Sequence, residues 1–272
     1  MTRPAAIAVP RLQWQSGVSR PGSRTVAEET PVALTYDGST YAVMMATPSN
    51  LTDFALGFSL SEGVVDEAAQ IESFEIVDVE GGIEARMWLT PAASARNRGR
   101  RRAILGPTGC GLCGVESVAQ ALKPLQNVGN AALTVSGDGL VAAMADLQTR
   151  QTLNAETRAV HAAGLWLPRG NLVVREDVGR HNALDKVIGA AAQAGLAGGD
   201  GVVLLTSRVS VELVQKTAQL GAPIIAAISA PTALAVKMAD AAGITLAAVL
   251  RGQDFEIFTR PDRIAKGARH EA

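Results

Sequence analysis

Cysteine is scarce in this chain: only Cys110 and Cys113 occur among its 272 residues. Two cysteines so close together cannot build the disulfide framework of a small secreted protein, and they fit a reducing compartment. Aromatic residues are also few, at 4%, whereas alanine, valine and glycine are frequent. This composition argues against an aromatic-rich binding surface and favours compact α/β packing.

An excess of charge of one sign and long apolar runs are absent as well. The formal net charge is −1, which excludes a bulk nucleic-acid binder. No stretch approaches the roughly 20 consecutive apolar residues of a membrane span. Residues 1–4 do not lead into an apolar signal core with a cleavage site. We therefore expect a cytoplasmic protein with neither a membrane nor a nucleic acid as a partner.

Both cysteines lie in one glycine-rich segment, residues 109–114, which reads Gly-Cys-Gly-Leu-Cys-Gly. Glycine removes the side chains that would fix such a segment, so another molecule can approach the sulfur atoms closely. Residues 115–120 look like the start of a helix, whose N-terminal dipole favours the thiolate form of a nearby cysteine. Because the thiolate is the nucleophilic form, the pattern indicates reactive cysteines.

Three other interpretations of the cysteine pair stay open. A redox pair could cycle between dithiol and disulfide, although a thioredoxin-like setting would place it directly after a strand. A zinc site needs four ligands, so His161 or His181 would have to complete it. The two residues could also be inert and buried.

A basic run at residues 96–102 precedes the cysteines and contains five arginines: Arg96, Arg98, Arg100, Arg101 and Arg102. Such runs are usually solvated loops. The alternative is a cationic rim that steers an acidic partner or a phosphate-bearing ligand and lowers the pKa of a neighbouring thiol.

The first half of the chain indicates a small α+β domain. Residues 1–25 lack apolar periodicity and are expected to be a flexible lead-in. Residues 31–45 predict a β-hairpin around the turn Asp37-Gly38, and residues 71–89 predict a second one. Between them, Ser49 or Asn50 could cap a helix. We place this domain at residues 26–130, ending in the arginine-rich and cysteine loops.

The second half, residues 131–265, indicates a helix-covered, mainly parallel sheet, and residues 266–272 form a tail. Its strands are near-continuous apolar runs separated by amphipathic helices, a pattern typical of strands buried on both faces. The predicted strands are 161–167, 172–176, 202–206, 224–228 and 245–249. The predicted helices begin near residues 140, 181, 210 and 231.

Polar residues follow several of these strands. In open α/β sheets, ligands bind beyond the carboxyl ends of the strands, where the following helices direct their N-termini. Hydroxyls, guanidinium groups and free backbone N–H groups there suit a phosphate. The candidates are Asp177, His181, Ser207, Arg208, Ser229 and Thr232. Alternatively, Ser210 and Thr232 only cap helices, and His181 is a hydrogen-bonded structural residue.

Several motifs together resemble the FdhD family of formate dehydrogenase accessory sulfurtransferases, over roughly residues 26–262. They are residues 28–34, 44–48, 53–58 with 62–63, 109–114, 175–186, 207–210 with 214–216, and 229–232. The resemblance implies a homodimeric sulfur carrier. Such a carrier accepts sulfur from a cysteine desulfurase and transfers it to the bis(molybdopterin guanine dinucleotide) molybdenum cofactor of formate dehydrogenase.

The resemblance also assigns residues to this chemistry. It implies that Cys110 carries the persulfide and that Cys113 assists by resolving or relaying sulfur. It implies transient cofactor binding, with GDP as an analogue, by a segment near the C-terminus. That segment comprises Val249, Leu250, Arg251, Gly252, Gln253 and Asp254.

A cytidine-deaminase-like fold is implied for the second half. Zinc deaminases place His-x-Glu at one helix start and Cys-x-x-Cys at the next. Here His181 is followed by Asn182-Ala183, and residues 207–210 read Ser-Arg-Val-Ser, so no metal ligand set is expected. Two rival functions remain: a zinc-dependent hydrolase or deaminase, and a chaperone that delivers cofactor without transferring sulfur.

Overall fold

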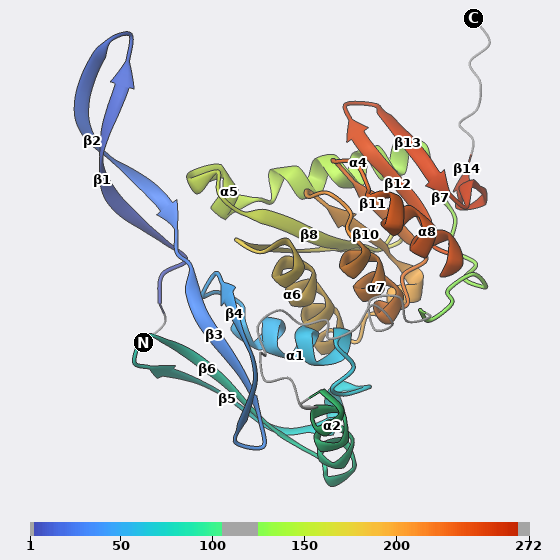
Figure 1. Ribbon diagram of the computed structural model, residues 1–272. Helices are drawn as coiled ribbons and strands as arrows, with labels where there is room; N and C mark the ends of the chain where they lie inside the picture. Colours follow the sequence, from blue (N-terminus) through green and yellow to red (C-terminus); the bar gives the residue numbers. More distant parts are fainter. Residues whose placement is uncertain (1–2, 105–124, 266–272) are drawn as a thin grey trace, which may run out of the picture.

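The computed structural model describes residues 3–104 and 125–265, and side chains throughout these ranges except at 99–104. Cys110, Cys113 and the tail expected at 266–272 lie outside the described residues. In the part that is described, the chain has an N-terminal hairpin, a four-stranded sheet and a six-stranded sheet with helices (Figure 1). The α/β class is confirmed.

The N-terminus begins with a long antiparallel hairpin rather than the expected flexible lead-in. It consists of β1 (Ala6–Gln15) and β2 (Val18–Ala27), paired along their whole length. The two-residue turn is Ser16-Gly17, with φ of 50° and 84°. Such a turn matches the twist of a hairpin. The sequence did not predict these strands because proline and glycine are unfavourable in most strands. An edge strand tolerates both residues.

The first half of the chain contains a four-stranded sheet in the order β4-β3-β6-β5, with β3 and β6 parallel. Both predicted hairpins are confirmed, and Asp37 and Gly38 take positive φ angles of 50° and 75°. Helix α1 follows β4, but neither Ser49 nor Asn50 caps it with a side chain. The elements are β3 (Thr30–Tyr36), β4 (Ser39–Ala46), α1 (Leu51–Ser61), η1 (Ala68–Gln70), β5 (Ile71–Val79) and β6 (Gly82–Leu89).

The arginine run begins inside a helix rather than in a loop. Helix α2 spans Pro91–Ile104 and therefore includes residues 96–102. Arginine is a good helix former, and proline is well suited to the first helical position, where Pro91 lies. Arg96 forms an ion pair of 2.7 Å with Asp66. The predicted loop is wrong, while a role for the run in steering anions stays a prediction.

The second half is built on a six-stranded sheet in the order β13-β12-β11-β10-β8-β9. Strands β10, β11 and β12 are parallel, whereas β8, β9 and β13 are antiparallel to their neighbours. The sheet is thus less parallel than expected, because the short connections β8–β9 and β12–β13 leave no room for a crossover. The strands are β8 (His161–Trp166), β9 (Leu172–Asp177), β10 (Val202–Leu205), β11 (Ile224–Ala227), β12 (Thr245–Arg251) and β13 (Asp254–Thr259).

Helices cover both faces of this sheet (Figure 1). Alternate strand residues, such as Val203 and Leu205, pack with α6, α7 and α8, whereas Val202 and Leu204 pack with α4 on the opposite face. This two-sided burial explains the apolar strand sequences. The helices are α4 (Gly137–Thr149), α5 (Thr152–Thr157), α6 (Arg180–Gln193), α7 (Val211–Leu220) and α8 (Ala233–Ala241). The short elements are β7 (Val135–Ser136), η2 (Gly198–Asp200), η3 (Pro261–Arg263) and β14 (Ile264–Ala265). No helix among the described residues is long and apolar enough to cross a membrane.

Helices α1 and α6 join the two halves through a close crossing at two glycines. A Cβ atom on Gly57 would lie 1.7 Å from the backbone oxygen of Asp185. A Cβ atom on Gly189 would lie 1.9 Å from the backbone oxygen of Asp53. No larger residue fits at either position without moving a helix, so both glycines set the distance between the halves.

Candidate functional site

The three loops that follow β10, β11 and β12 lie together along one edge of the large sheet. Backbone hydrogen bonds connect them in sequence. The amide of Thr232 donates to the carbonyl of Val209 at 3.0 Å, and the amide of Val249 donates to the carbonyl of Ser229 at 3.4 Å. Parallel strands present their carboxyl ends at the same edge. The structure therefore brings the loops at 206–210 and 228–232 next to the segment that begins at Val249.

A histidine from β8 and the start of α6 reach the same edge. His161 pairs with Asp177 in the β8–β9 ladder, and the amide of Ala162 donates to the hydroxyl of Thr206 at 2.9 Å. Antiparallel pairing with β10 thus places the beginning of β8 beside the carboxyl end of β10. Burial, and secondarily the positive charge of Arg180, lowers the pKa of His161.

His181 lies in a polar cluster between α6 and α7. Its Nε2 is 3.3 Å from the hydroxyl of Ser210 and 3.7 Å from a carboxylate oxygen of Glu212. Burial lowers the pKa of His181, and the charge of Arg180 lowers it further, while Glu212 opposes them. The imidazole is therefore mainly neutral at pH 7 and can accept or donate a hydrogen bond.

Arg180 is the residue that the sequence prediction missed at this edge. Its positive charge contributes to the lowered pKa of His161, His181 and Glu212. Its Nε is buried and has no hydrogen-bond partner among the described residues. A buried donor of this kind can bind an oxygen of an anionic ligand. The signal in the sequence was its position at the start of a helix that follows a strand.

The remaining hydroxyl and guanidinium candidates differ in their surroundings. The Ser207 hydroxyl is buried and donates to the carbonyl of Arg208 at 3.0 Å, whereas the Arg208 side chain is exposed. The Thr232 hydroxyl accepts from the amide of Ala235, which confirms that Thr232 caps α8. Ser210 precedes α7 without a capping bond from its side chain. Arg208 is therefore the exposed cation of the loops at 206–210 and 228–232.

Asp177 does not fit the role of a ligand contact. Its carboxylate is fully buried and lies 2.7 Å from the ammonium group of Lys186. It also accepts hydrogen bonds from the amides of Thr47 and Gly179 and from the side chain of Asn182. These partners occupy both carboxylate oxygens. Asp177 thus connects the two halves of the structure, and its carboxylate has no oxygen left for a ligand.

The segment 249–254 forms the end of β12, a tight turn and the start of β13. A bulge interrupts the ladder between Ala248 and Arg251, and Val249 has a φ of 56°. A β-branched residue rarely takes a positive φ, and such strain occurs mainly where the surrounding structure demands it. Leu250 is buried in the core, while Arg251 and the residues up to Asp254 are exposed. Only part of this segment can therefore contact a ligand.

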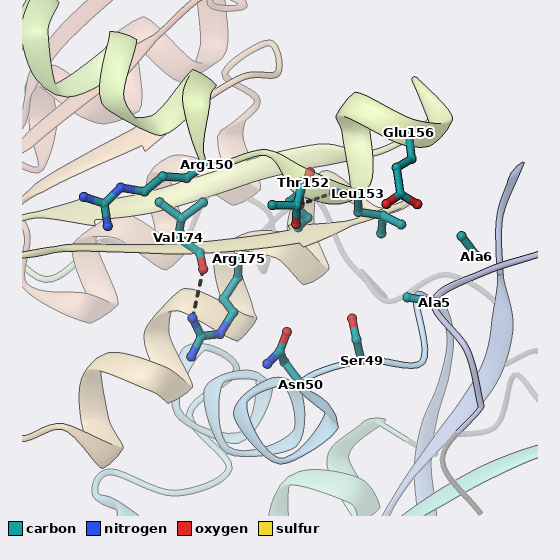
Figure 2. A pocket seen from close by; sticks show the side chains of 11 residues that line it. Ala5, Ala6, Ser49, Asn50, Arg150, Thr152, Leu153, Glu156, Val174 and Arg175 are labelled. Atoms are coloured by element: carbon teal, nitrogen blue, oxygen red, sulfur yellow. Dashed lines mark hydrogen bonds between the residues drawn. The ribbon is translucent and has the colours of Figure 1, made fainter. Parts of the chain in front are cut away.

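A pocket of about 500 Å³ opens elsewhere, where the base of the N-terminal hairpin meets β9 and α5 (Figure 2). Two arginines line it, but both already have carboxylate partners. Arg150 lies 2.8 Å from Asp146, and Arg175 lies 2.7 Å from Asp53. The pocket thus offers no free cation, and it includes none of the predicted site residues.

Two sequence-based interpretations cannot be placed on this geometry. Cys110 and Cys113 lie outside the described residues, so their proximity to the sheet edge stays a prediction. In residues 3–104 and 125–265, no group of three or more histidine, cysteine, aspartate or glutamate residues is arranged to hold a metal ion. A zinc site would depend on the two cysteines, and it stays a hypothesis.

The sequence profile of the FdhD/NarQ family matches residues 27–265. The chain belongs to the FdhD/NarQ family. This confirms the resemblance carried by the sequence motifs. The match includes the strand-end loops, both cysteines and the segment 249–254, and it leaves most of the N-terminal hairpin outside.

Curated FdhD proteins are similar over nearly the whole chain. One from Agrobacterium fabrum, named "Sulfur carrier protein FdhD", is 54% identical and covers 94% of this chain and 95% of its own length. One of the same name from Cupriavidus necator is 47% identical and covers 96% of this chain and 89% of its own. A solved structure, "Crystal structure of a putative formate dehydrogenase accessory protein from Desulfotalea psychrophila", is 25% identical with a TM-score of 0.76, covering 96% of this chain and all of that one.

Proposed function

We propose that this FdhD/NarQ-family protein is a sulfur carrier that serves formate dehydrogenase. The observation that carries the proposal is 54% identity over 94% of the chain with a protein named as a sulfur carrier. Both cysteines lie within the residues that match the family, 27–265. A protein with only these two thiols must use one of them if it carries sulfur covalently.

The chemistry is a persulfide relay that begins at Cys110. Its thiolate attacks the terminal sulfur of a persulfide on a cysteine desulfurase. The sulfur–sulfur bond of the donor breaks, the donor leaves as a thiolate, and the transferred sulfur stays on Cys110 as a persulfide. If the Cys113 thiolate then attacks the inner sulfur, the two cysteines form a disulfide and the outer sulfur leaves as hydrosulfide. The glycines on either side of the pair allow such close approaches.

The acceptor is the bis(molybdopterin guanine dinucleotide) molybdenum cofactor of formate dehydrogenase, which this protein binds transiently as a substrate. The strand-end loops suit the phosphates of such a nucleotide. Arg208 offers an exposed guanidinium group, and Arg180 offers a buried donor without a partner. The neutral imidazole of His181 can hydrogen-bond a base or ribose. The exposed part of the 249–254 segment borders the same loops.

The proposed setting is cytoplasmic, and the protein acts as a homodimer between a cysteine desulfurase and formate dehydrogenase or its cofactor. Intact mass spectrometry after incubation with a desulfurase and cysteine tests the relay. We expect a sulfur adduct on the wild type and on Cys113→Ala, with a reduced amount on the latter. No adduct is expected on Cys110→Ala. A normal adduct on Cys110→Ala would refute the assignment of Cys110.

The same samples separate the alternative functions. A chaperone that only delivers cofactor would bind GDP and never gain sulfur. A zinc-dependent hydrolase would contain zinc in stoichiometric amount, which metal analysis of the purified protein detects. Either result would replace the sulfur-carrier proposal.

The nucleotide part of the proposal is tested by calorimetric titration with GDP. Arg208→Gln removes one charge-assisted contact, which is typically worth about 1.5 to 3 kcal/mol. The expected loss of affinity is therefore roughly ten- to a hundredfold. Arg169→Gln is the matched control, because Arg169 is also an exposed arginine and lies in the β8–β9 turn, at the opposite end of the strands. Equal affinity of the Arg208→Gln and Arg169→Gln proteins would refute a phosphate contact by Arg208.

A further inference from the structure

The hairpin formed by β1 and β2, called the arm below (residues 6–27), extends away from the rest of the molecule (Figure 1). Residues 12–24 are all exposed. At the base of the arm the ladder extends by one more bond, from the amide of Glu28 to the carbonyl of Ala5 at 2.9 Å. The arm contacts the body beside α5, where the Arg24 guanidinium donates to the carbonyl of Thr157 at 3.3 Å. The outer part of the arm therefore has no packing partner among the described residues of its own chain.

The arm has two chemically different faces. Residues directly opposite in an antiparallel pair lie on the same face, and the faces alternate along each strand. The register places Leu12 opposite Pro21 and Trp14 opposite Ser19, so this face is uncharged. The other face carries all the charges of the arm, which are Arg11, Arg20 and Arg24.

Such a ribbon is poorly suited to standing alone in water. An isolated two-stranded hairpin is marginally stable at best. Leu12 and Trp14 keep 74% and 72% of their surface exposed. Both long edges of the ribbon also leave backbone groups free to pair with another strand. A protein of stable fold that exposes these features generally covers them with a partner.

The distribution of charge indicates what that partner is. Residues 1–27 contain four arginines and no acidic residue. The whole chain has 25 basic and 26 acidic residues, so the remaining residues have 21 and 26, a net charge of −5. A cationic arm and an anionic body in one chain attract each other when two copies meet. In a twofold dimer the same contact forms twice.

We propose that the arm of each copy docks on the acidic edge strand β13 of a second copy, giving an arm-exchanged dimer. Strand β13 forms the edge of the large sheet, so its outer backbone groups can accept a further strand. It carries Asp254 and Glu256 beside Ile257 and Phe258, which are 39% and 37% exposed. It therefore offers carboxylates for the arginine-bearing face and apolar surface for Leu12 or Trp14.

The other acidic edge, strand β5, fits less well. Two of its three acidic residues, Glu75 and Asp78, already lie within 4.0 Å and 2.9 Å of Arg86 and Arg3. No ion pair joins Asp254 or Glu256 to a cation in the part of the chain that the structure describes. Because β13 begins at the end of the 249–254 segment, the docked arm would lie beside the candidate cofactor site of its partner. The proposal adds the contact surface to the homodimer proposed above, and it does not depend on sulfur transfer.

Sedimentation velocity over a dilution series tests the arm. We expect the wild type to be a dimer and Leu12→Ser/Trp14→Ser to dimerise about a hundredfold more weakly, since a buried tryptophan is often a dominant contact and is used twice. Both side chains are exposed within one chain, so the fold should be retained, which circular dichroism checks. Val43→Ser is the control, because Val43 is an exposed apolar residue on an edge strand of the body.

The charged faces provide a second readout. Arg11→Gln/Arg20→Gln and Asp254→Asn/Glu256→Gln should each weaken dimerisation at low salt, and their effect should shrink as salt rises, since exposed charges are screened. A photo-crosslinking amino acid at position 14 should join two copies, with the linked peptide containing β13. An unchanged dimer in all arm variants would overturn the role of the arm and leave the homodimer intact, whereas a monomeric wild type would overturn both. If the crosslinker at position 14 reacted only with anionic vesicles or nucleic acid, the second copy would likewise be refuted as the partner. Sulfur loading by Cys110 does not depend on the outcome of these experiments.

Discussion

The ammonium nitrogen of Lys186 lies 2.7 Å from the carboxylate of Asp177, and neither side chain is exposed. Lys186 also donates to the carbonyl of Thr47, and Asp177 accepts from the amide of the same residue. Burial lowers the pKa of Lys186, and the negative charge of Asp177 opposes that change. Through Thr47, this pair therefore attaches helix α6 and strand β9 to the segment that leads into α1.

A second buried pair starts from the preceding residue of α6. Asp185 lies 2.9 Å from Lys216 of α7 and accepts from the hydroxyl of Ser61 in α1. Burial raises the pKa of Asp185, although Lys216 and Ser61 counteract it. Burial acts to lower the pKa of Lys216, but the carboxylates of Asp185 and Glu62 outweigh it, and its pKa is raised. Neighbouring residues of one helix thus fix both halves through opposite charges.

Breaking the first pair should be strongly destabilising. Asp177→Asn or Lys186→Met leaves one uncompensated buried charge, for which a loss of about 3 to 5 kcal/mol is typical. The double variant Asp177→Asn/Lys186→Met should lose less than the sum of the two, since no unpaired charge remains. Urea unfolding gives the free energies. Single variants that lose less than about 1 kcal/mol would contradict the structural role of the pair.

The close crossing of α1 and α6 predicts that even a methyl group at either glycine lowers the stability of the protein. Gly57→Ala and Gly189→Ala each place a methyl group against the backbone of the opposite helix, so the helices must separate. Overpacking of this kind costs typically 1 to 3 kcal/mol, and about that loss is expected in urea unfolding. Gly170→Ala is the control, because the nearest atom to its Cβ would be 3.7 Å away. Equal stability of all three variants would show that the crossing adapts freely.

The two histidines at the sheet edge predict a dependence of stability on pH. Burial lowers the pKa of both His161 and His181 from the ordinary value of 6.5. The unfolded chain then binds more protons than the folded protein as the pH falls through about 6.5. Stability should therefore decrease from pH 7.5 to pH 5.5, and His161→Gln/His181→Gln should lose less over this interval. A pH profile identical to that of the wild type would refute the effect.

The arginine run predicts a dependence of sulfur loading on ionic strength. Replacing Arg96, Arg98, Arg100, Arg101 and Arg102 by glutamine should slow loading from a desulfurase at low salt. The difference should disappear at high salt, because exposed charges act on the association rate and are screened over about 8 Å at physiological ionic strength. Mass spectrometry of samples quenched at successive times gives the rate of adduct formation. An unchanged rate at every salt concentration would leave only the solvated-surface interpretation.

Features that depend on neighbouring residues were predictable from the sequence. The Asp37-Gly38 turn was predictable because a tight hairpin needs positive φ at both positions, and few residue pairs supply it. The strands at 202–205 and 224–227 were predictable because an uninterrupted apolar run must be buried on both faces. The arm was missed because Pro10, Pro21 and Gly22 usually interrupt strands, and only an unpacked edge ribbon accepts all three.

The motifs alone carried the resemblance to the family. Local backbone preferences and apolar patterning were enough to predict the order of most elements and the loops that gather at the sheet edge. These patterns could not separate Asp177 from Arg208, which both follow strands and both looked suited to a ligand. Only the folded chain distinguishes them. Thr47, 130 residues away along the chain, packs over Asp177 and takes up its carboxylate, while nothing comparable covers Arg208. Burial of a polar group depends on which distant segment lies against it, and that is a property of the folded chain alone.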